Sequence, residues 1–424
     1  MTTYYVTADA EGGGVGSQID PWTIQEALNG LASGGSLAAA DIVKIKAGSH
    51  SMSGNVTAAN DGTVVAPIVF MACDASWNEF VPSRSATTKL LDHTSWGSID
   101  FGSYIVNFSG SNSLIFRGLK ITGSRAGYII NLGLDGAMFG CAVINAANSS
   151  SAYAIVCYND NCLLYNCDAA CTGSSSNAAI SVVDISAKII NCVIYSSKAD
   201  GILLSYSYGY SVVSGCLIYG YGTNGIKMSA GTSNSVVILN CTIDGGATGT
   251  KQGIMFVDDD NAYAHPITNC IITGNTVGIY LSHATGMGLI AASNHLYNNT
   301  TDIDWDGNTQ EYGNIITETS DFRDAANADY RLDILAPALT AGPFGSPIGH
   351  IGIEDVAALA NVLSSETLMG EAGTFVEADR NTDPGIANVK TGTEYKILNV
   401  SKTGEYSASG GGLLGNPNKR GGKQ

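Results

Sequence analysis

Two groups of aspartates have a spacing that could bind a cation or transfer a proton. Asp302, Asp304 and Asp306 alternate in the segment DIDWDGN, as the first carboxylates of a calcium loop do. The position at which a bidentate Glu would close such a loop is Gly313, and Glu311 comes two places early. The pattern therefore predicts either a calcium site or a last strand followed by a polar turn.

The second group lies in FVDDDNAYAHP, where Asp258, Asp259 and Asp260 precede His265. Clustered carboxylates separate their pKa values, so these residues could form a catalytic acid/base pair or ligate a metal. The alternative is a solvated acidic turn without chemistry. Calcium is the only cofactor that we consider for either group.

Aromatic and sulfur-containing residues form two further clusters. The segment SYSYGYSVVSGCLIYGYG holds five tyrosines whose outward rings could stack on sugars or pack against a partner subunit, with an ordinary polar strand as the alternative: Tyr206, Tyr208, Tyr210, Tyr219 and Tyr221. Cys157, Cys162, Cys167 and Cys171 have a spacing similar to that of a zinc or iron–sulfur run. One turn of a coil would place these four Cys on different sides of the β-coil, too far apart to share a metal. Packing in the core is therefore favoured over a metal site.

A repeat of about 25 residues decides where these side chains lie. One series of apolar or small positions consists of Leu119, Cys141, Cys167, Cys192, Cys216, Cys241, Cys270 and His295. A second series with the same period consists of Ile155, Ile180, Ile202, Ile226, Ile254 and Ile279. Two series with one period predict at least two short strands in each turn, separated by Gly-, Asn- and Ser-rich connections.

A coil of this period indicates a parallel β-helix, in which successive coils pair at about 4.8 Å. We expect about ten coils between Val43 and Trp305. Cys recurs because it is a small side chain that can be buried and can stack on its own copy, so we predict free, packed thiols. The Asn that precedes several of these Cys could form a second ladder at a bend in which left-handed backbone is tolerated.

This architecture separates the early basic residues from the acidic group. Arg117, Lys120 and Arg125 fall in early coils, roughly 25 Å from Asp258 at the spacing of paired strands. No Arg occurs between Arg125 and Arg323. We therefore predict that carboxylates and basic groups do not converge in one active site.

The first coil needs a cap, because open strand edges pair with other chains. The segment DPWTIQEALNGL, residues 20–31, predicts a helix with Ile24, Ala27 and Leu28 on one face, between Pro21 and Gly30. We expect an N-terminal strand and capping helix over residues 1–40 and the β-helix over residues 41–353. A small C-terminal attachment region with a flexible Gly-rich tail would occupy residues 354–424.

Six segments in fixed order between residues 3 and 353 carry a family resemblance: YYVTADAEGGG, PWTIQEALNGL, DIVKIKAGSH, GTVVAPIVF, DYRLDILAPALTAG and IGHIGIED. They resemble the pectate-lyase-like, right-handed parallel β-helix repeat proteins. The resemblance implies an all-β, right-handed solenoid. It leaves the function open, because the family includes polysaccharide lyases and hydrolases, cell-surface adhesins, viral tailspikes and other virion proteins.

Composition excludes two kinds of partner. The net charge of −17 opposes binding to nucleic acid, whose phosphates are neutralised by Lys and Arg. The segment MTTYYVTADAEGGG has no basic region followed by an apolar stretch, as a secretory signal would, and no apolar run is long enough to cross a membrane. We therefore expect neither nucleic acid nor a membrane as a partner.

The leading hypothesis is a virion structural protein, namely a fibre, spike or capsid decoration, located in the virion outside cells. It rests on the missing secretory signal, on the separated acids and bases, and on the segment DPGIANVKTGTEY, which is similar to short modules of phage virion proteins. Its partners would be other virion proteins, its own subunits in a homotrimer, and cell-surface polysaccharide.

Two alternatives keep the same fold. One is a carbohydrate-active enzyme, a polysaccharide lyase or glycosidase that includes the depolymerising tailspikes, with Asp258 to Asp260 and Asp302 to Asp306 at its site. The other is a cell-surface adhesin.

Overall fold

The computed structural model describes residues 1–349 apart from short gaps, and no residue beyond Gly349. The gaps are 86–88, 93–97, 105, 109–112, 159–160, 175–176, 184–185, 196, 206–209, 230–235, 248, 258–263, 282–287, 306–308, 318–321, 326–328, 333–337 and 339–348. The chain separates into two compact units, Met1–Val356 and Ala357–Gln424. The second unit lies outside the described residues, so the C-terminal attachment region stays a prediction.

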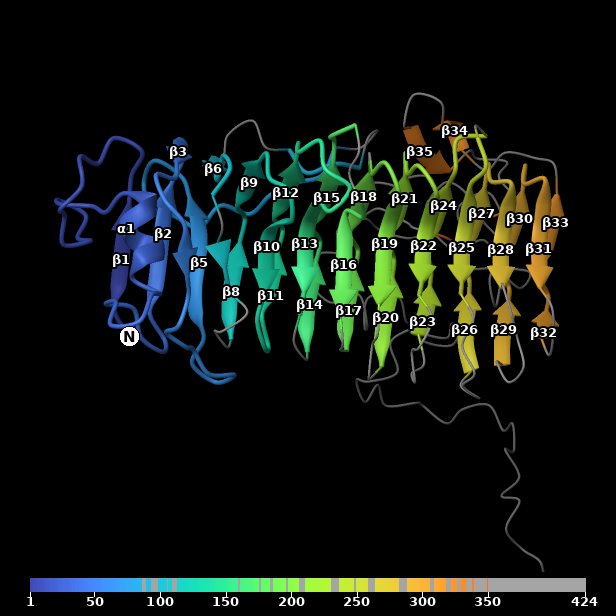
Figure 1. Cartoon of the computed structure of the whole chain (residues 1–424), viewed down its shortest axis with the longest axis horizontal. Helices are drawn as coiled ribbons and strands as arrows, with labels where there is room; N and C mark the ends of the chain where they lie inside the picture. The colour runs from blue at the N-terminus through green and yellow to red at the C-terminus, as the bar shows by residue number, and fades with distance from the viewer. Residues whose placement is uncertain are drawn as a thin grey trace, which may run out of the picture. The chain divides into compact units, whose positions relative to one another are not determined.

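Three parallel sheets enclose one core (Figure 1). Sheet A contains β1 (Thr3–Val6), β2 (Ile42–Lys46), β5 (Ile68–Cys73), β8 (Leu114–Arg117), β11 (Ala137–Phe139), β14 (Cys162–Tyr165), β17 (Ala187–Ile190), β20 (Ser211–Ser214), β23 (Val236–Leu239), β26 (Ala264–Thr268), β29 (Gly288–Ala292) and β32 (Thr309–Tyr312). Sheet B contains β3 (Ser49–Ser51), β6 (Ser98–Asp100), β9 (Lys120–Gly123), β12 (Ala142–Asn145), β15 (Asp168–Cys171), β18 (Val193–Tyr195), β21 (Leu217–Tyr219), β24 (Thr242–Asp244), β27 (Ile271–Thr273), β30 (His295–Tyr297) and β33 (Ile315–Thr317). Sheet C contains β4 (Val56–Thr57), β7 (Val106–Asn107), β10 (Tyr128–Leu132), β13 (Tyr153–Cys157), β16 (Ile180–Val183), β19 (Asp200–Ser205), β22 (Asn224–Met228), β25 (Gln252–Phe256), β28 (Val277–Leu281) and β31 (Thr301–Trp305).

Each coil visits sheets C, A and B in turn, so the chain forms a parallel β-helix. Within each sheet a strand pairs with the equivalent strand one coil away. The predicted series of Ile residues is confirmed in sheet C, where Ile155 pairs with Ile180 and the register continues through Ile202, Ile226, Ile254 and Ile279. The sheets described hold 12, 10 and 11 strands, which agrees with the predicted number of about ten coils.

The helix α1 (Ile24–Asn29) closes the first coil, as predicted. Thr23 caps it, since its hydroxyl accepts from the backbone N–H of Glu26 while the Glu26 carboxylate accepts from the N–H of Thr23. Ile24, Ala27 and Leu28 are all buried. The helix therefore places one apolar face against the interior of the β-helix and covers the open end.

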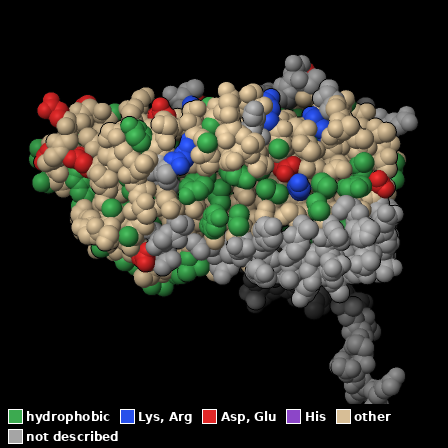
Figure 2. Space-filling model, viewed as in Figure 1, with side chains coloured by type: hydrophobic (Ala, Val, Ile, Leu, Met, Phe, Trp, Pro, Cys, Tyr) green, Lys and Arg blue, Asp and Glu red, His purple; other side chains and the backbone are tan. Residues whose placement is uncertain are grey.

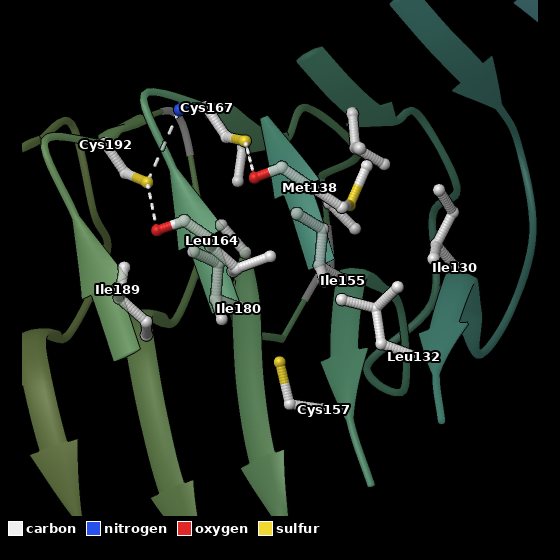
Figure 3. Packing of buried hydrophobic residues seen from close by; sticks show 14 of the residues in the cluster. Ile130, Leu132, Met138, Ile155, Cys157, Leu164, Cys167, Ile180, Ile189 and Cys192 are labelled. Atoms are coloured by element: carbon white, nitrogen blue, oxygen red, sulfur yellow. Dashed lines mark hydrogen bonds between the residues drawn. The ribbon is translucent and has the colours of Figure 1, made fainter. Parts of the chain in front are cut away.

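The cysteines form a ladder of free thiols in the core. All ten Cys are buried and none forms a disulfide, so the prediction of packed thiols is confirmed. Figure 3 shows the Cys167 thiol donating to the Met138 carbonyl and the Cys192 thiol to the Leu164 carbonyl, each in the preceding coil (3.4 and 3.6 Å). Because burial disfavours the thiolate, the pKa of Cys171 rises to about 12. Cys171 therefore stays protonated and is a structural residue.

The predicted Cys ladder continues after Cys270 with Asn294 and not with His295. The pairing of Ile271 with His295 places Asn294, not His295, in register with Cys270. The prediction for His295 was therefore wrong by one residue, because only the strand pairing fixes the register. Asn294 replaces the thiol's hydrogen bond with an amide N–H to the Ile267 carbonyl (2.9 Å), and Asn314 donates in the same way to Ala291 (3.1 Å).

A tight bend between sheets A and B precedes each residue of the Cys ladder, from Leu119 to Asn314. One residue at each bend has a positive φ, between 52° and 66°, and these are Gly118, Gly140, Asn166, Asn191, Gly215, Asn240, Asn269, Ser293 and Gly313. Asn and Gly dominate because they tolerate left-handed backbone. The Asn269 amide donates to the Asn240 side chain, so the predicted contact between stacked Asn is found for this one pair.

A strap between β5 and β6, which includes residues 79–92, runs across these bends. The Phe80 carbonyl and the Pro82 ring lie so close to Gly118 and Gly140 that a Cβ at either glycine would clash. Farther along, the Arg84 guanidinium binds the Asp168 carboxylate at 2.7 Å. The strap therefore lies against the outer side of the sheet A and sheet B junction.

Arg84 fixes the strap through a buried network. Its Nε donates to the Asn166 side chain at 2.6 Å, and its guanidinium also donates to backbone carbonyls, including that of Asn191 (3.1 Å). The Leu91 N–H donates to the second oxygen of Asp168 (2.7 Å). Asp168 is only 1% exposed, so its charge depends on partners within the protein, and the strap supplies Arg84 and the Leu91 N–H.

A hairpin after the last coil covers the other half of sheet B. Its strands are β34 (Phe322–Asp324) and β35 (Asp329–Leu332), which pair antiparallel. Phe322 packs against Tyr297 of β30, and Tyr330 packs against Tyr219 of β21 (6.4 and 5.0 Å between ring centroids). Figure 1 shows the hairpin beside the later strands of sheet B.

Candidate functional site

The outer faces of the three sheets differ in chemistry. Outward positions of sheet A are mostly apolar, for example Ile115, Phe139 and Ile190, which share rows with their neighbours in register. A hollow on this sheet, lined by Val69, Ile115, Arg117 and Phe139, has a volume of about 160 Å³, well below the several hundred Å³ of a typical ligand pocket.

Sheet B is closed on its outer side by the strap and the hairpin. Outward residues of its later strands are also buried: Leu217, Thr242 and Ile271 are at most 1% exposed, and Gly349 lies against Thr242 and Ile271. Sheet C differs from both: one outward row contains polar, charged and long side chains in register, namely Leu203, Lys227, Met255, Tyr280 and Asp304. Each of these is at least partly exposed.

Lysines are rare in this part of the chain, yet three gather in neighbouring coils. Between Arg125 and Arg323 the sequence contains no Arg and only four Lys, namely Lys188, Lys198, Lys227 and Lys251. Lys227 lies on β22, Lys251 directly precedes β25, and Lys198 lies two residues before β19. We call Lys198, Lys227 and Lys251 the lysine cluster. It lies on sheet C and at the corner where sheet B strands lead into sheet C.

The rest of the surface makes the lysine cluster distinctive. Figure 2 shows one face of the molecule, on which the charged side chains that are drawn in colour are few and scattered. The chain as a whole carries a net charge of −17. A cluster of three cations on such a chain is a local reversal of charge.

Each end of the lysine cluster adjoins a buried carboxylate. Asp200 at the start of β19 is 5% exposed and accepts from the Asn224 amide at 2.6 Å. Burial raises the pKa of Asp200, while the Asn224 hydrogen bond and the charge of Lys227 oppose that rise. Asp200 and Lys227 therefore interact through their charges, with no ion pair between them among the described contacts.

Asp244 and Lys251 form the second pair of interacting charges. Asp244 ends β24, is 7% exposed, and accepts from the Gly246 N–H (2.8 Å) and the Tyr330 hydroxyl (2.9 Å). The Lys251 ammonium donates to the Gly245 carbonyl at 2.6 Å and lies 5.7 Å from the ring centroid of Tyr221. A short glycine-containing turn thus brings the carboxylate and the ammonium to one corner.

Burial moves both pKa values of this pair toward neutrality. Burial raises the pKa of Asp244, against the effect of its hydrogen bonds and of Lys251. Burial lowers the pKa of Lys251, an effect that Asp244 opposes and Lys198 strengthens. A lysine with a lowered pKa accepts a proton less tightly than an ordinary lysine and is neutral more often, and a nearby carboxylate stabilises the ammonium that results.

The prediction that acids and bases do not converge stays a prediction, because Asp258 to Asp260 lie outside the described residues. That prediction compared the acidic groups with Arg117, Lys120 and Arg125 and left the lysine cluster out. Lys251 follows Asp244 by only seven residues in DGGATGTK. This short spacing across a corner was the signal that could have identified the pair.

The predicted calcium residues lie on a strand. Asp302 and Asp304 belong to β31, at alternate positions on one face, and Asp302 accepts from the Asn299 amide (3.0 Å). Asp306 lies outside the described residues. Calcium requires six to eight oxygens that converge, and no group of three His, Cys, Asp or Glu suited to a metal occurs among the residues described. The two described carboxylates do not fit calcium by themselves.

The acidic group is only partly described. Asp258, Asp259 and Asp260 lie in the connection between β25 and β26, outside the described residues. His265 was expected in the same outward loop, but it lies on β26 with a fully buried side chain. Its Nδ1 accepts from the Val236 N–H (3.2 Å), and its ring packs 5.2 Å from Phe256. His265 is therefore a core residue, which corrects its assignment to a surface site.

The predicted tyrosine surface is divided. Tyr206 and Tyr208 lie outside the described residues, whereas Tyr210 is 54% exposed and Tyr219 is partly buried against Tyr195. Tyr221 is 1% exposed and donates to the Asn275 side chain at 2.5 Å. Its expected outward orientation was wrong, because the corner turns its ring into the core. Binding of a glycan or a partner by Tyr210 and Tyr219 stays a prediction.

The four cysteines with metal-like spacing are distributed over the coil. Cys157, Cys162 and Cys171 lie on β13, β14 and β15, and Cys167 belongs to the bend. Figure 3 shows Cys157 pointing into the core well away from Cys167. Core packing, the favoured alternative, is confirmed.

Comparison with known proteins identifies the class of fold. Residues 104–301 match the family model described as a right handed beta helix region. Pectate lyase Pel9A is 16% identical, with a TM-score of 0.60 over 83% of this chain and 94% of that chain. An alginate lyase from Paenibacillus sp. str. FPU-7 is 16% identical, with a TM-score of 0.42 over 74% of this chain and 95% of that chain. No curated protein matches the sequence.

These findings confirm the predicted fold class. The chain is an all-β, right-handed parallel β-helix with an N-terminal capping helix, and it shares this fold with pectate lyase Pel9A. Within the described residues, no helix has both the length and the apolar character needed to cross a membrane.

Proposed function

We propose that this protein is a carbohydrate-active β-helix that binds an acidic polysaccharide along the lysine cluster and cleaves it by elimination. The observation that carries the proposal is the pairing of Asp244 with Lys251 at a corner of an otherwise acidic molecule. The fold shared with a pectate lyase supports it, since pectate is a polyuronate. The virion role, the adhesin role and the homotrimer stay predictions.

Lys198 and Lys227 bind the carboxylates of the polysaccharide in this proposal. Lys198 and Lys251 belong to coils separated by one intervening coil, so their backbones lie about 10 Å apart at the spacing of paired strands. This separation exceeds the length of one sugar unit, so Lys198 can bind a carboxylate of one sugar while Lys251 faces a different sugar of the same extended chain. Charge attraction also concentrates such a polymer at the lysine cluster, which the net negative charge elsewhere would repel.

Lys251 accepts the proton in the proposed step. Its neutral Nζ takes the proton from the carbon next to the uronate carboxylate, and the electron pair released forms a carbon–carbon double bond. The bond from the adjacent carbon to the glycosidic oxygen breaks, and that oxygen takes a proton from water. Asp244 stabilises the Lys251 ammonium, which returns its proton to solvent. No oxidant or cofactor is required.

The test is a depolymerisation assay on the full chain. Polyuronates and neutral polysaccharides are incubated with the protein, with and without calcium, and ultraviolet absorbance of unsaturated ends is followed. We expect turnover of polyuronates only, a loss of about 100-fold or more in kcat for Lys251→Met, and unchanged kcat for the control Lys188→Met on sheet A. Absence of turnover on every polyuronate, or full activity of Lys251→Met, would overturn the proposal.

A further inference from the structure

An aromatic row on the outer side of sheet B is interrupted at Asp244. Register places one side chain of each strand in this row, in the order Tyr195, Tyr219, Asp244, Thr273 and Tyr297. Tyr195 and Tyr219 stack with their ring centroids 5.9 Å apart. The smaller Asp244 and Thr273 then leave a gap before the next ring.

The C-terminal hairpin fills this gap. Tyr330 packs 5.0 Å from Tyr219 on one side, Phe322 packs 6.4 Å from Tyr297 on the other, and the two hairpin rings meet edge to face at 5.3 Å. Phe322 and Tyr330 are 6% and 4% exposed. Ring packing of this kind holds a side chain in one orientation, so the Tyr330 hydroxyl has a fixed position.

That hydroxyl reaches the carboxylate of the Asp244–Lys251 pair. Tyr330 Oη donates to Asp244 Oδ2 at 2.9 Å, and the Gly246 N–H donates to Oδ1 at 2.8 Å. Each oxygen of Asp244 therefore has a partner that fixes its direction. One partner comes from the adjacent turn, and the other comes from a segment 86 residues later in the chain.

We propose that Tyr330 is a positioning residue, which holds the Asp244 carboxylate beside Lys251 and makes the C-terminal hairpin part of the proton-transfer site. The catalytic consequence rests on the proposed function. The positioning itself does not, because it is a property of the hydrogen bond and of the packing that orients it. The β-helix coils alone would leave Asp244 without its second partner.

The sign of the effect follows from the groups that face Asp244. Tyr330 and the Gly246 N–H stabilise its charged form, and Lys251 does so through its ammonium. Tyr221 also interacts electrostatically with Asp244, and Lys198 acts on Lys251. Removing the Tyr330 hydroxyl withdraws one hydrogen bond from the carboxylate. The pKa of Asp244 then rises, because the charged form loses more stabilisation than the protonated form.

Carboxyl carbon NMR of the full chain labelled at aspartate measures this directly. The Asp244 signal is assigned by its loss in Asp244→Asn, and its titration is compared between wild type, Tyr330→Phe and Tyr195→Phe. We expect the Asp244 midpoint to rise by about one pH unit in Tyr330→Phe. The control Tyr195→Phe removes a hydroxyl from the same aromatic row without touching Asp244, so its midpoint should not move. Equal midpoints in the two variants would overturn the proposal.

Two further measurements keep the inference testable. If Tyr330→Phe does not fold, Phe322→Leu loosens the hairpin while it keeps the hydroxyl, and the Asp244 midpoint should move in the same direction by a smaller amount. In the depolymerisation assay, the acid limb of the pH profile should move to higher pH in Tyr330→Phe, with KM unchanged. If wild type cleaves no polyuronate, the proposed function fails, and the titration still decides whether Tyr330 positions Asp244.

Discussion

At the residue scale, the protein holds carboxylates inside or against its core and gives each a specific partner. Asp168 has Arg84, Asp244 has Tyr330 and Gly246, and Asp200 has the Asn224 amide. Because an ion pair, a hydroxyl and an amide stabilise a carboxylate to different extents, the three carboxyl groups bind a proton with different affinities. Burial raises the pKa of Asp200 from its ordinary value of 3.8, because a single amide and a nearby lysine do not compensate for lost hydration.

The raised pKa of Asp200 predicts a pH-dependent cost to stability. Folded Asp200 binds its proton more tightly than unfolded Asp200 does. Protonated Asp200 therefore contributes to the free energy of unfolding in full below pH 3.8, and this contribution is lost as the pH rises through the pKa of the folded state. Asp200→Asn keeps an oxygen for the Asn224 amide and cannot ionise. Its free energy of unfolding, relative to wild type, should therefore increase between pH 4 and pH 7. Urea unfolding at several pH values tests this, and a difference that does not vary with pH would contradict it.

At the element scale, segments outside the coils decide which faces of the β-helix remain accessible. The strap and the C-terminal hairpin cover sheet B from opposite ends, and both are attached through buried carboxylates of sheet B strands, Asp168 and Asp244. Among the residues described, no segment of this kind covers sheet C, where the lysine cluster lies. The covering segments therefore exclude the outer side of sheet B as the binding face of an extended ligand.

The strap should depend on one ion pair. Arg84→Met removes the cation that is paired with the buried Asp168 carboxylate, which should cost about 3–5 kcal/mol in free energy of unfolding. Arg117→Met is the matched control, since the Arg117 pair with Glu79 (3.0 Å) is 44% and 34% exposed and should contribute less than about 1 kcal/mol. Urea unfolding distinguishes the two. Equal losses would show that the buried pair does not hold the strap.

At the scale of the whole β-helix, the two ends of the coil stack are unlike. The first coil is covered by α1, whereas Ile316 on the last sheet B strand is 60% exposed. Ile316 is in register with Leu296 and Ile272, both fully buried in the same inward row. The inward position that is buried in the preceding coils is thus partly exposed to solvent at Ile316, in the last coil.

Position along the stack should therefore set the cost of a core substitution. Leu296→Ala removes a side chain with a paired coil on each side and should cost about 2–5 kcal/mol. Ile316→Ala has a coil on one side only among the strands described, and should cost less than half as much. Thermal unfolding of the two variants measures the difference. Equal costs would mean that the last coil is as well packed as the interior.

The sequence by itself determined the coil. The two series of apolar residues gave the strands, the inward rows and the free thiols, because a period of about 25 residues fixes which side chains stack. The left-handed Asn at the bends and the helix with Ile24, Ala27 and Leu28 followed from local backbone preference. These features depend on neighbours one period away or closer, so they can be derived from the order of residues.

Only the tertiary structure decided which acids meet which bases. The side on which Lys198, Lys227 and Lys251 gather depends on the lengths of the corners, and the inward turn of Tyr221 and His265 depends on local register. The contacts of Arg84 with Asp168 and of Tyr330 with Asp244 join residues 84 and 86 positions apart. A repeat carries no information about such contacts, because they are made by unique segments that pack across coils.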